Sequence, residues 1–132
     1  MAYVHNIIAS DPLYQNAART LSFTVYTDAS TDEQIAAGTA TCLDISGFAL
    51  RWRLADRNGQ KAVRITKTTS AGITITGTFN ATPSVNTQRA VVTLAAADVI
   101  ADIDTYDHGL WRTDTGSETV LCTGTAVVKA AP

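Results

Sequence analysis

The sequence is poor in the residues that most often carry catalysis, metal binding or redox chemistry. Its 132 residues include two cysteines and two histidines. Cys42 and Cys122 are far apart, and no Cys/His pair has zinc-ligand spacing. Two free thiols are the default expectation for a chain made in a reducing cytosol, with a disulfide as the alternative. His5 and His108 have no neighbouring nucleophile or acidic partner at useful spacing. We therefore expect no enzyme activity, no cofactor and no metal site.

Charge and long apolar runs are also scarce. Charged residues make up 17% of the chain, and the formal net charge is −2. Such a balance gives no reason to expect binding to nucleic acid or to a membrane through bulk electrostatics. No window approaches the roughly 18 apolar residues that span a bilayer. Residues 1–10 lack the basic flank and apolar run of a secretory signal. The length predicts one domain with a single core.

Period-two alternation is the clearest pattern present. Between residues 47 and 54, large apolar side chains occupy every second position, and Arg51 and Arg53 fall between them. The pattern predicts a strand with one buried face and one charged face. Asn58-Gly59 favours a tight hairpin turn that returns the chain beside this strand. The expected core positions of the first strand are Phe48, Leu50, Trp52 and Leu54.

The remaining segments predict an all-β fold. The 21 threonines suit strands with a polar, β-branched outer face. Ser30 to Gln34 resembles a helix cap and Gly38 a stop, which predicts one helical turn. A second short turn is expected within residues 95–103. We predict an immunoglobulin-like antiparallel β-sandwich of about seven to eight strands over residues 19–132, preceded by an N-terminal arm over residues 1–18. Further strands are expected over residues 19–27, 72–79, 89–94, 105–112 and 118–128.

The order of these motifs resembles a known family. Asp44-Ile45-Ser46-Gly47 opens the strand that ends in the Asn-Gly hairpin, and a strand ending at Leu94 leads through a short crossing to residues 105–112. The closing segment is Leu121-Cys122-Thr123-Gly124-Thr125-Ala126-Val127-Val128. Over residues 19–128 this series resembles the immunoglobulin-like domains of tailed-phage virion proteins, in particular the N-terminal domain of the phage baseplate upper protein family.

That resemblance implies a function in a virus particle. Baseplate upper proteins usually continue into long fibrous segments, whereas this sequence holds one domain. The resemblance therefore implies an accessory virion subunit, such as a capsid decoration or a small tail or baseplate component, made in the host cytoplasm. Its partners would be other virion proteins, contacted in many copies on a symmetric lattice.

The charges are distributed unevenly along the chain. Six of the ten basic residues lie in one hairpin, while residues 98–118 hold six acids against one base. We expect Arg51, Arg53 and Arg64 to share the outer face of that hairpin. One interpretation is an intramolecular match or a solvated face, and the other is a head-to-tail contact with acidic surface on a neighbour. The hairpin basic residues are Arg51, Arg53, Arg57, Lys61, Arg64 and Lys67.

Two further features complete the candidate contact surface. The uncharged arm either docks on a neighbouring sheet edge or pairs within its own domain as the first strand. Trp111 is out of phase with Tyr106 and Leu110, so it either joins a contact surface or packs under a neighbouring loop. The candidate interface residues are Arg51, Arg53, Arg64, Tyr3, Val4, Ile7, Ile8 and Trp111.

Alternative sites are less well supported by the sequence. A carbohydrate-binding module for host attachment would expose Trp111 or Tyr26 beside polar groups. His108, in the middle of a predicted strand, is interpreted as a hydrogen-bonded, partly buried ring. A calcium site would draw on a group of loop carboxylates, but the loop lacks the glycine and distal glutamate of an EF-hand, so solvated carboxylates are expected. The carboxylates in question are Asp98, Asp102, Asp104 and Asp107.

Overall fold

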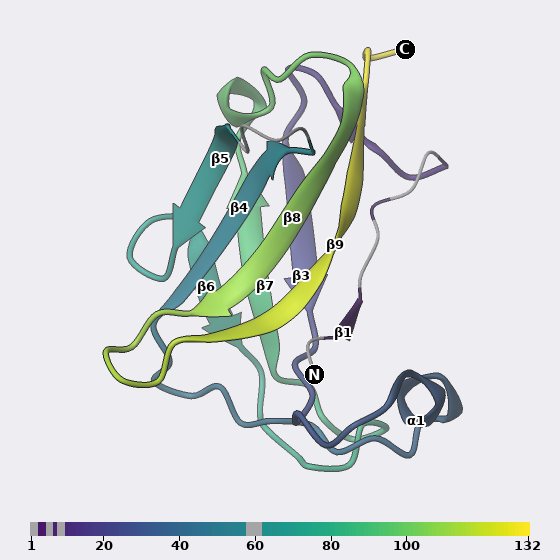
Figure 1. Cartoon of the computed structure of the whole chain (residues 1–132), viewed down its shortest axis with the longest axis vertical. Coiled ribbons are helices and arrows are strands. Elements are labelled where there is room, and N and C mark those ends of the chain that lie inside the picture. The colour runs from purple at the N-terminus through teal and green to yellow at the C-terminus, as the bar shows by residue number, and fades with distance from the viewer. Residues whose placement is uncertain (1–2, 5–6, 8–9, 58–61) are drawn as a thin grey trace.

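The chain folds into two β-sheets with one short helix (Figure 1). The computed structural model describes residues 3–4, 7, 10–57 and 62–132. The large sheet has the strand order β1-β9-β8-β4-β5, with β2 also beside β9, and the small sheet has the order β3-β7-β6. The large sheet comprises β1 (Tyr3–Val4), β2 (Leu13–Tyr14), β4 (Leu50–Asp56), β5 (Val63–Thr68), β8 (Asp104–Arg112) and β9 (Thr119–Lys129). The small sheet comprises β3 (Arg19–Phe23), β6 (Ile73–Thr76) and β7 (Arg89–Leu94).

Strand direction differs from the prediction at one edge. The pairs β4/β5, β4/β8, β8/β9, β3/β7 and β6/β7 are antiparallel, as expected. β1 and β2 instead run parallel to β9. The expectation of a purely antiparallel fold is therefore wrong here, because the N-terminal segment adds to the free edge of β9 in the same direction as that strand. The Asn58-Gly59 turn lies outside the described residues.

The short helical elements follow their local sequence. α1 (Asp32–Ala37) begins at a capping box, in which the Gln34 amide donates to Thr31 Oγ1 over 3.2 Å and the Thr31 amide donates to Gln34 Oε1 over 2.9 Å. It ends at Gly38, whose φ of 74° is left-handed. A 3-10 turn, η1 (Ala96–Asp98), follows β7. Both helical turns predicted from the sequence are confirmed.

One hydrophobic core lies between the two sheets. Trp52 and Leu110 of the large sheet and Phe23 of the small sheet are fully buried. Trp52 Nε1 donates a hydrogen bond to His108 Nδ1 over 3.1 Å, and the His108 ring centroid lies 6.0 Å from that of Phe23. The expected burial of Trp52 and the hydrogen-bonded role of His108 are confirmed. Both cysteine thiols are free and buried, as the default expectation had it.

Phe48 departs from its predicted place. β4 begins at Leu50, so Phe48 precedes the strand and packs, partly buried, against the margin of the core. The Arg112 guanidinium lies 3.7 Å from the centroid of the Phe48 ring. The alternation from Phe48 to Leu54 therefore predicts the buried face correctly from Leu50 onward, and for Phe48 it is confirmed only in part, since that ring contacts the core from outside the strand. Pairing with β8 reaches only to Leu50, which is opposite Arg112.

We predict that the two tryptophans differ sharply in their contribution to stability. Trp52→Ala removes a fully buried side chain and the donor to His108, and should lower the free energy of unfolding by about 3–5 kcal/mol. Trp111→Ala, at a partly exposed position, should cost about 1 kcal/mol or less. Urea denaturation followed by circular dichroism measures both. Equal losses would contradict the assignment of Trp52 to the core.

Candidate functional site

The outer face of the large sheet carries the candidate site. In Figure 1 this sheet lies in front of the small sheet, with β4, β8 and β9 side by side. Since Trp52 and Leu54 point into the core, the alternate residues Arg51 and Arg53 point outward. The register places Arg51 opposite Trp111 on β8. Strand pairing therefore brings three of the predicted interface residues together, although Trp111 lies about 60 positions from the arginines in sequence.

A hollow of about 650 Å³ lies over this face. Its floor is made of small residues, among them Gly109, which is opposite Arg53. A Cβ at position 109 would lie 3.0 Å from Trp111 Nε1, so the indole extends across the glycine. The sequence reasoning missed this floor, although Asp107, Gly109 and Trp111 share one face by the alternation of β8. The hollow is lined by Arg51, Arg53, Ala55, Val63, Asp107, His108, Gly109, Trp111, Thr123, Gly124 and Thr125.

Trp111 forms one wall of the hollow and is 37% exposed. The Arg51 guanidinium lies 5.6 Å from the centroid of its ring, within the range of a cation–π interaction. Of the two interpretations of Trp111, the structure favours a side chain on an open surface, since the ring lies among outward-facing residues of the sheet. The second candidate aromatic, Tyr26, is only partly exposed, and burial raises the pKa of its phenol.

Arg51 and Arg53 are held at this face without a carboxylate partner. Within the part of the chain that the structure describes, neither guanidinium forms an ion pair, and the Nε atom of each is buried without a hydrogen-bond partner. Burial lowers the pKa of Arg51, and the neighbouring charge of Arg53 lowers it further. Two like charges on one strand face therefore remain available to an anionic group.

Three other hairpin cations are matched within the domain. Arg57 lies 3.4 Å from Asp107, and Lys67 lies 2.8 Å from Asp98, so both meet the acidic segment of their own chain. The Arg64 guanidinium forms two hydrogen bonds with Asp56, of 2.8 and 2.9 Å. The intramolecular match is thus the correct interpretation for these three residues. Lys61 lies outside the described residues.

Arg64 does not share the outer face with Arg51 and Arg53, and that prediction is wrong. The β4/β5 register shifts between Leu54 and Ala55, and Arg64 is the extra residue on β5. Its guanidinium is held by Asp56, an interaction that raises the pKa of Arg64, and it lines a second hollow of about 470 Å³ with Asp102, Asp104 and Tyr106. A bulge cannot be read from side-chain alternation alone.

The N-terminal arm pairs within its own domain. Tyr3 is opposite Cys122 and Val4 opposite Thr123 on β9. Farther along, the Ile7 amide donates to the Thr125 carbonyl over 2.8 Å, and Ile7 is 3% exposed. The structure thus shows the alternative in which the arm pairs with a strand of its own domain, at the edge of the large sheet. Ile7 belongs to the core. Ile8 lies outside the described residues.

The carboxylates of residues 98–107 do not converge. Asp98 faces Lys67 and Asp107 faces Arg57, while Asp102 and Asp104 line the second hollow. Across residues 3–4, 7, 10–57 and 62–132, no three or more His, Cys, Asp or Glu side chains are grouped to hold a metal ion. In the same ranges, no helix has the length and hydropathy to cross a membrane.

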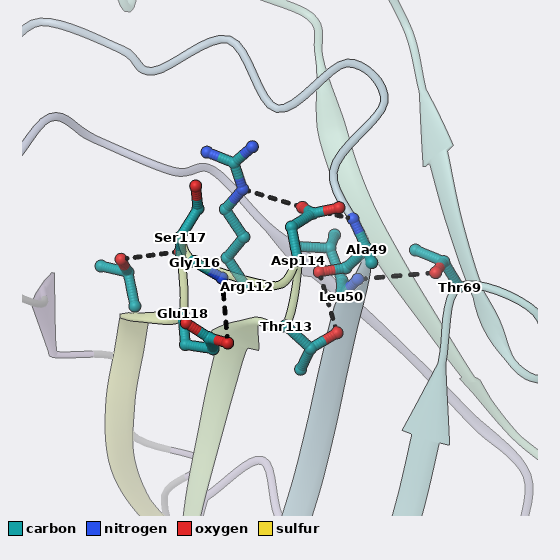
Figure 2. Close-up of polar contacts among 10 residues, drawn as sticks. Ala49, Leu50, Thr69, Arg112, Thr113, Asp114, Gly116, Ser117 and Glu118 are labelled. Carbon is teal, nitrogen blue, oxygen red and sulfur yellow. Dashed lines mark hydrogen bonds and ion pairs between the residues drawn. The ribbon is translucent and has the colours of Figure 1, made fainter.

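A polar clasp fixes the ends of the two strands that carry the site (Figure 2). Asp114 Oδ2 accepts hydrogen bonds from Arg112 Nε over 2.8 Å and from the Ala49 amide over 3.0 Å. The Thr113 amide donates to the Ala49 carbonyl over 2.8 Å. These bonds join the chain just after Trp111 to the chain just before Arg51, so the clasp holds the two walls of the hollow in register.

We predict a pH-dependent contribution from Asp114. Hydrogen bonding to Arg112, and then to the Ala49 amide, lowers the pKa of Asp114 below its ordinary value of 3.8. The folded state therefore gains stability from the ionised carboxyl above about pH 4, and this gain is lost as pH falls through the lowered pKa. Asp114→Asn should lower the free energy of unfolding at pH 7, and the difference from wild type should shrink below about pH 4.

Urea titrations at several pH values measure this difference. Asp102→Asn is the matched control, because Asp102 is exposed and should change the free energy of unfolding by about 0.5 kcal/mol or less. A difference for Asp114→Asn that stays constant from pH 7 to pH 3 would show that the clasp does not depend on the charge.

Comparison with known proteins does not assign the site. No protein-family model matches the chain, and no match is found among curated proteins. The site is therefore defined by its own geometry: two unmatched guanidiniums, an exposed indole and a floor of small residues on the outer face of the large sheet.

Proposed function

We propose that the chain is a non-enzymatic structural protein of a tailed-phage virion. It would be an accessory capsid decoration or a small tail or baseplate subunit, with an immunoglobulin-like sandwich that presents a contact face. The resemblance over residues 19–128 supports the class of particle, and the all-β architecture of two sheets agrees with it. The observation that carries the proposed mode of action is the unmatched pair Arg51 and Arg53 beside Trp111.

The chemistry of this face suits a protein partner. The two Nε atoms are themselves buried, so a partner would meet the guanidiniums at their terminal nitrogens, where a carboxylate would pair with charges that have no ion-pair partner among the described residues. Arginine and tryptophan are also the side chains most enriched at the energetic centres of protein interfaces. Charge complementarity at such a face sets register and partner choice.

Multiplicity would make a modest contact sufficient. The hollow is lined by 11 residues, whereas a standard interface involves roughly 20–30 residues on each partner. On a symmetric particle, many weak contacts act together, because each bound subunit raises the effective concentration of the next contact. A small face with two charged anchors therefore fits a subunit that occurs in many copies.

We predict that charge reversal at this face prevents incorporation into virions. Arg51→Glu combined with Arg53→Glu should leave the isolated domain folded, because both side chains point outward, and should abolish incorporation into particles. Quantitative mass spectrometry of purified particles measures the copy number, and thermal unfolding checks the fold. Normal incorporation of the folded double variant would overturn the proposed interface.

Two control variants define the cause of any loss. Lys129→Glu makes the same charge change as either single reversal at an exposed position of β9, and it should incorporate normally. Arg51→Lys combined with Arg53→Lys keeps the charge but loses the planar fork of donors, and it should incorporate partially.

Carbohydrate binding for host attachment is the second candidate function. The observation in its favour is Trp111, exposed over a glycine floor with Thr123, Thr125 and Asp107 around it. An indole face with polar groups at its margin is a suitable stacking platform for a sugar ring. The same hollow would then serve a glycan in place of a protein.

A glycan array separates the two functions. If the second function holds, the wild-type chain should bind particular glycans saturably, and Trp111→Ala should weaken that binding about tenfold or more, because the stacking surface is lost. The matched control is Tyr14→Ala, which removes another aromatic side chain that is 37% exposed and should leave glycan binding unchanged. If the chain binds no glycan saturably, the second function is excluded and protein contact remains the proposed function.

A further inference from the structure

We infer that the hollow on the large sheet receives a loop of a second copy of this chain, in a head-to-tail contact. The loop, as defined here, spans residues 99–104, which are the connection from η1 and the first residue of β8. This inference rests on the proposed function. A subunit present in many copies has copies of itself as neighbours, and the inference names such a copy as the partner of the contact face. It is carried by the chemistry of the loop and by its place relative to the hollow.

The loop exposes two isoleucines. Ile100 is 69% exposed and Ile103 is 61% exposed, more than any other large apolar side chain in the described ranges. Such side chains gain free energy when a neighbour covers them. Two neighbouring residues are buried: Val99, which precedes Ile100, is fully buried, and Ala101, which follows it, is 7% exposed. The isoleucines are thus held outward on a supported turn.

Hydrogen bonds to its backbone carbonyls hold this loop in place. The Asn16 amide donates to the Val99 carbonyl over 2.8 Å, and Gln15 Nε2 donates to the Ala101 carbonyl over 2.9 Å. The Tyr106 hydroxyl donates to the Asp102 carbonyl. A loop that is already ordered loses little conformational entropy when it binds, which favours its use as a recognition element.

The loop also carries two available carboxylates. Asp102 and Asp104 are exposed, and neither forms an ion pair with a described residue. Arg64 lines the same hollow as these two residues, but its guanidinium is already engaged by Asp56. The loop therefore presents two apolar side chains and two acids on one short segment.

The hollow is complementary to that segment. Arg51 and Arg53 offer two cations, and Asp102 and Asp104 two carboxylates, none of which has an ion-pair partner among the described residues, although Asp104 accepts a hydrogen bond from the Thr105 amide. Trp111 and Val63, 37% and 47% exposed, offer apolar surface to the isoleucines. The floor at Gly109 leaves space for side chains that enter from a partner. Charge and apolar surface thus match in kind and in number.

The loop of the same copy does not line the hollow, since none of residues 99–104 is among its lining residues. The loop lies at the end of the molecule where β8 begins (Figure 1), while the Trp111 wall of the hollow is seven residues farther along β8, about 23 Å at roughly 3.3 Å per residue. One copy can therefore donate its loop and receive another at the same time. Such a heterologous contact generates a ring if the rotation closes and a filament if it does not.

Sedimentation velocity of the full chain tests the contact. The wild type should form oligomers that increase with protein concentration and decrease with added salt. Arg51→Ala with Arg53→Ala, and separately Asp102→Asn with Asp104→Asn, should each raise the dissociation constant about tenfold or more. Asp32→Asn with Glu33→Gln, an equal neutralisation on α1, should leave it unchanged. A wild type that stays monomeric at every concentration, or an equal response of all three variants, would overturn the inference.

Mixing the two neutralised variants tests direction. Each retains one competent surface, so the mixture should form a 1:1 dimer that does not grow, with the intact loop of the Arg51/Arg53 variant in the intact hollow of the other. No dimer in the mixture would overturn the head-to-tail arrangement.

Particle incorporation keeps the two proposals distinguishable. If Arg51→Glu with Arg53→Glu abolishes incorporation while the wild type does not self-associate, the hollow serves a different virion protein, and the inference fails while the proposed function stands. If the wild type self-associates through the loop while the same double variant incorporates normally, the inference stands and the proposed function fails.

Discussion

The pairing of β4 with β8 is the constraint on which the rest of the molecule depends. Trp52 is opposite Leu110, and its indole donates to His108 two residues back on β8. Because side chains alternate along a strand, fixing these residues inward fixes Arg51, Arg53 and Trp111 outward. A slip of one residue would bury two guanidiniums and expose the indole of Trp52. The same contacts that build the core therefore also determine the chemistry of the outer face.

Local features of the sequence predict much of this structure. The capping box at Thr31 and Gln34, and the alternation from Leu50 to Leu54, depend on residues close together in the chain. The β8 alternation likewise identifies Tyr106, His108 and Leu110 as buried. In each case the period or the cap is complete within a few residues, so no knowledge of the tertiary fold is needed.

The failures concern pairing between distant segments. The place of Arg64 depends on a bulge relative to β4, and the arm depends on the free edge of β9, neither of which has a signature in the sequence itself. The hollow depends on Gly109 and Gly124 lying on adjacent strands, which requires the β8/β9 register. Alternation along β8 puts Gly109 and Trp111 on one face, a signal that the sequence analysis did not use, but it does not say what lies beside them.

The arm and the ion pairs explain why the outer face of the large sheet stands out among the basic surfaces. β9 would expose an unpaired edge without β1, Ile7 and β2, and an open edge invites association with any strand. At the opposite edge of the sheet, on β5, Arg64 and Lys67 form ion pairs with carboxylates of the same chain. Surface ion pairs of this kind add little stability, but they leave few charges free for a partner. Against that background, Arg51 and Arg53 are cations on a rigid strand that the domain does not satisfy. The specificity of any contact then follows from which surface brings acids to them.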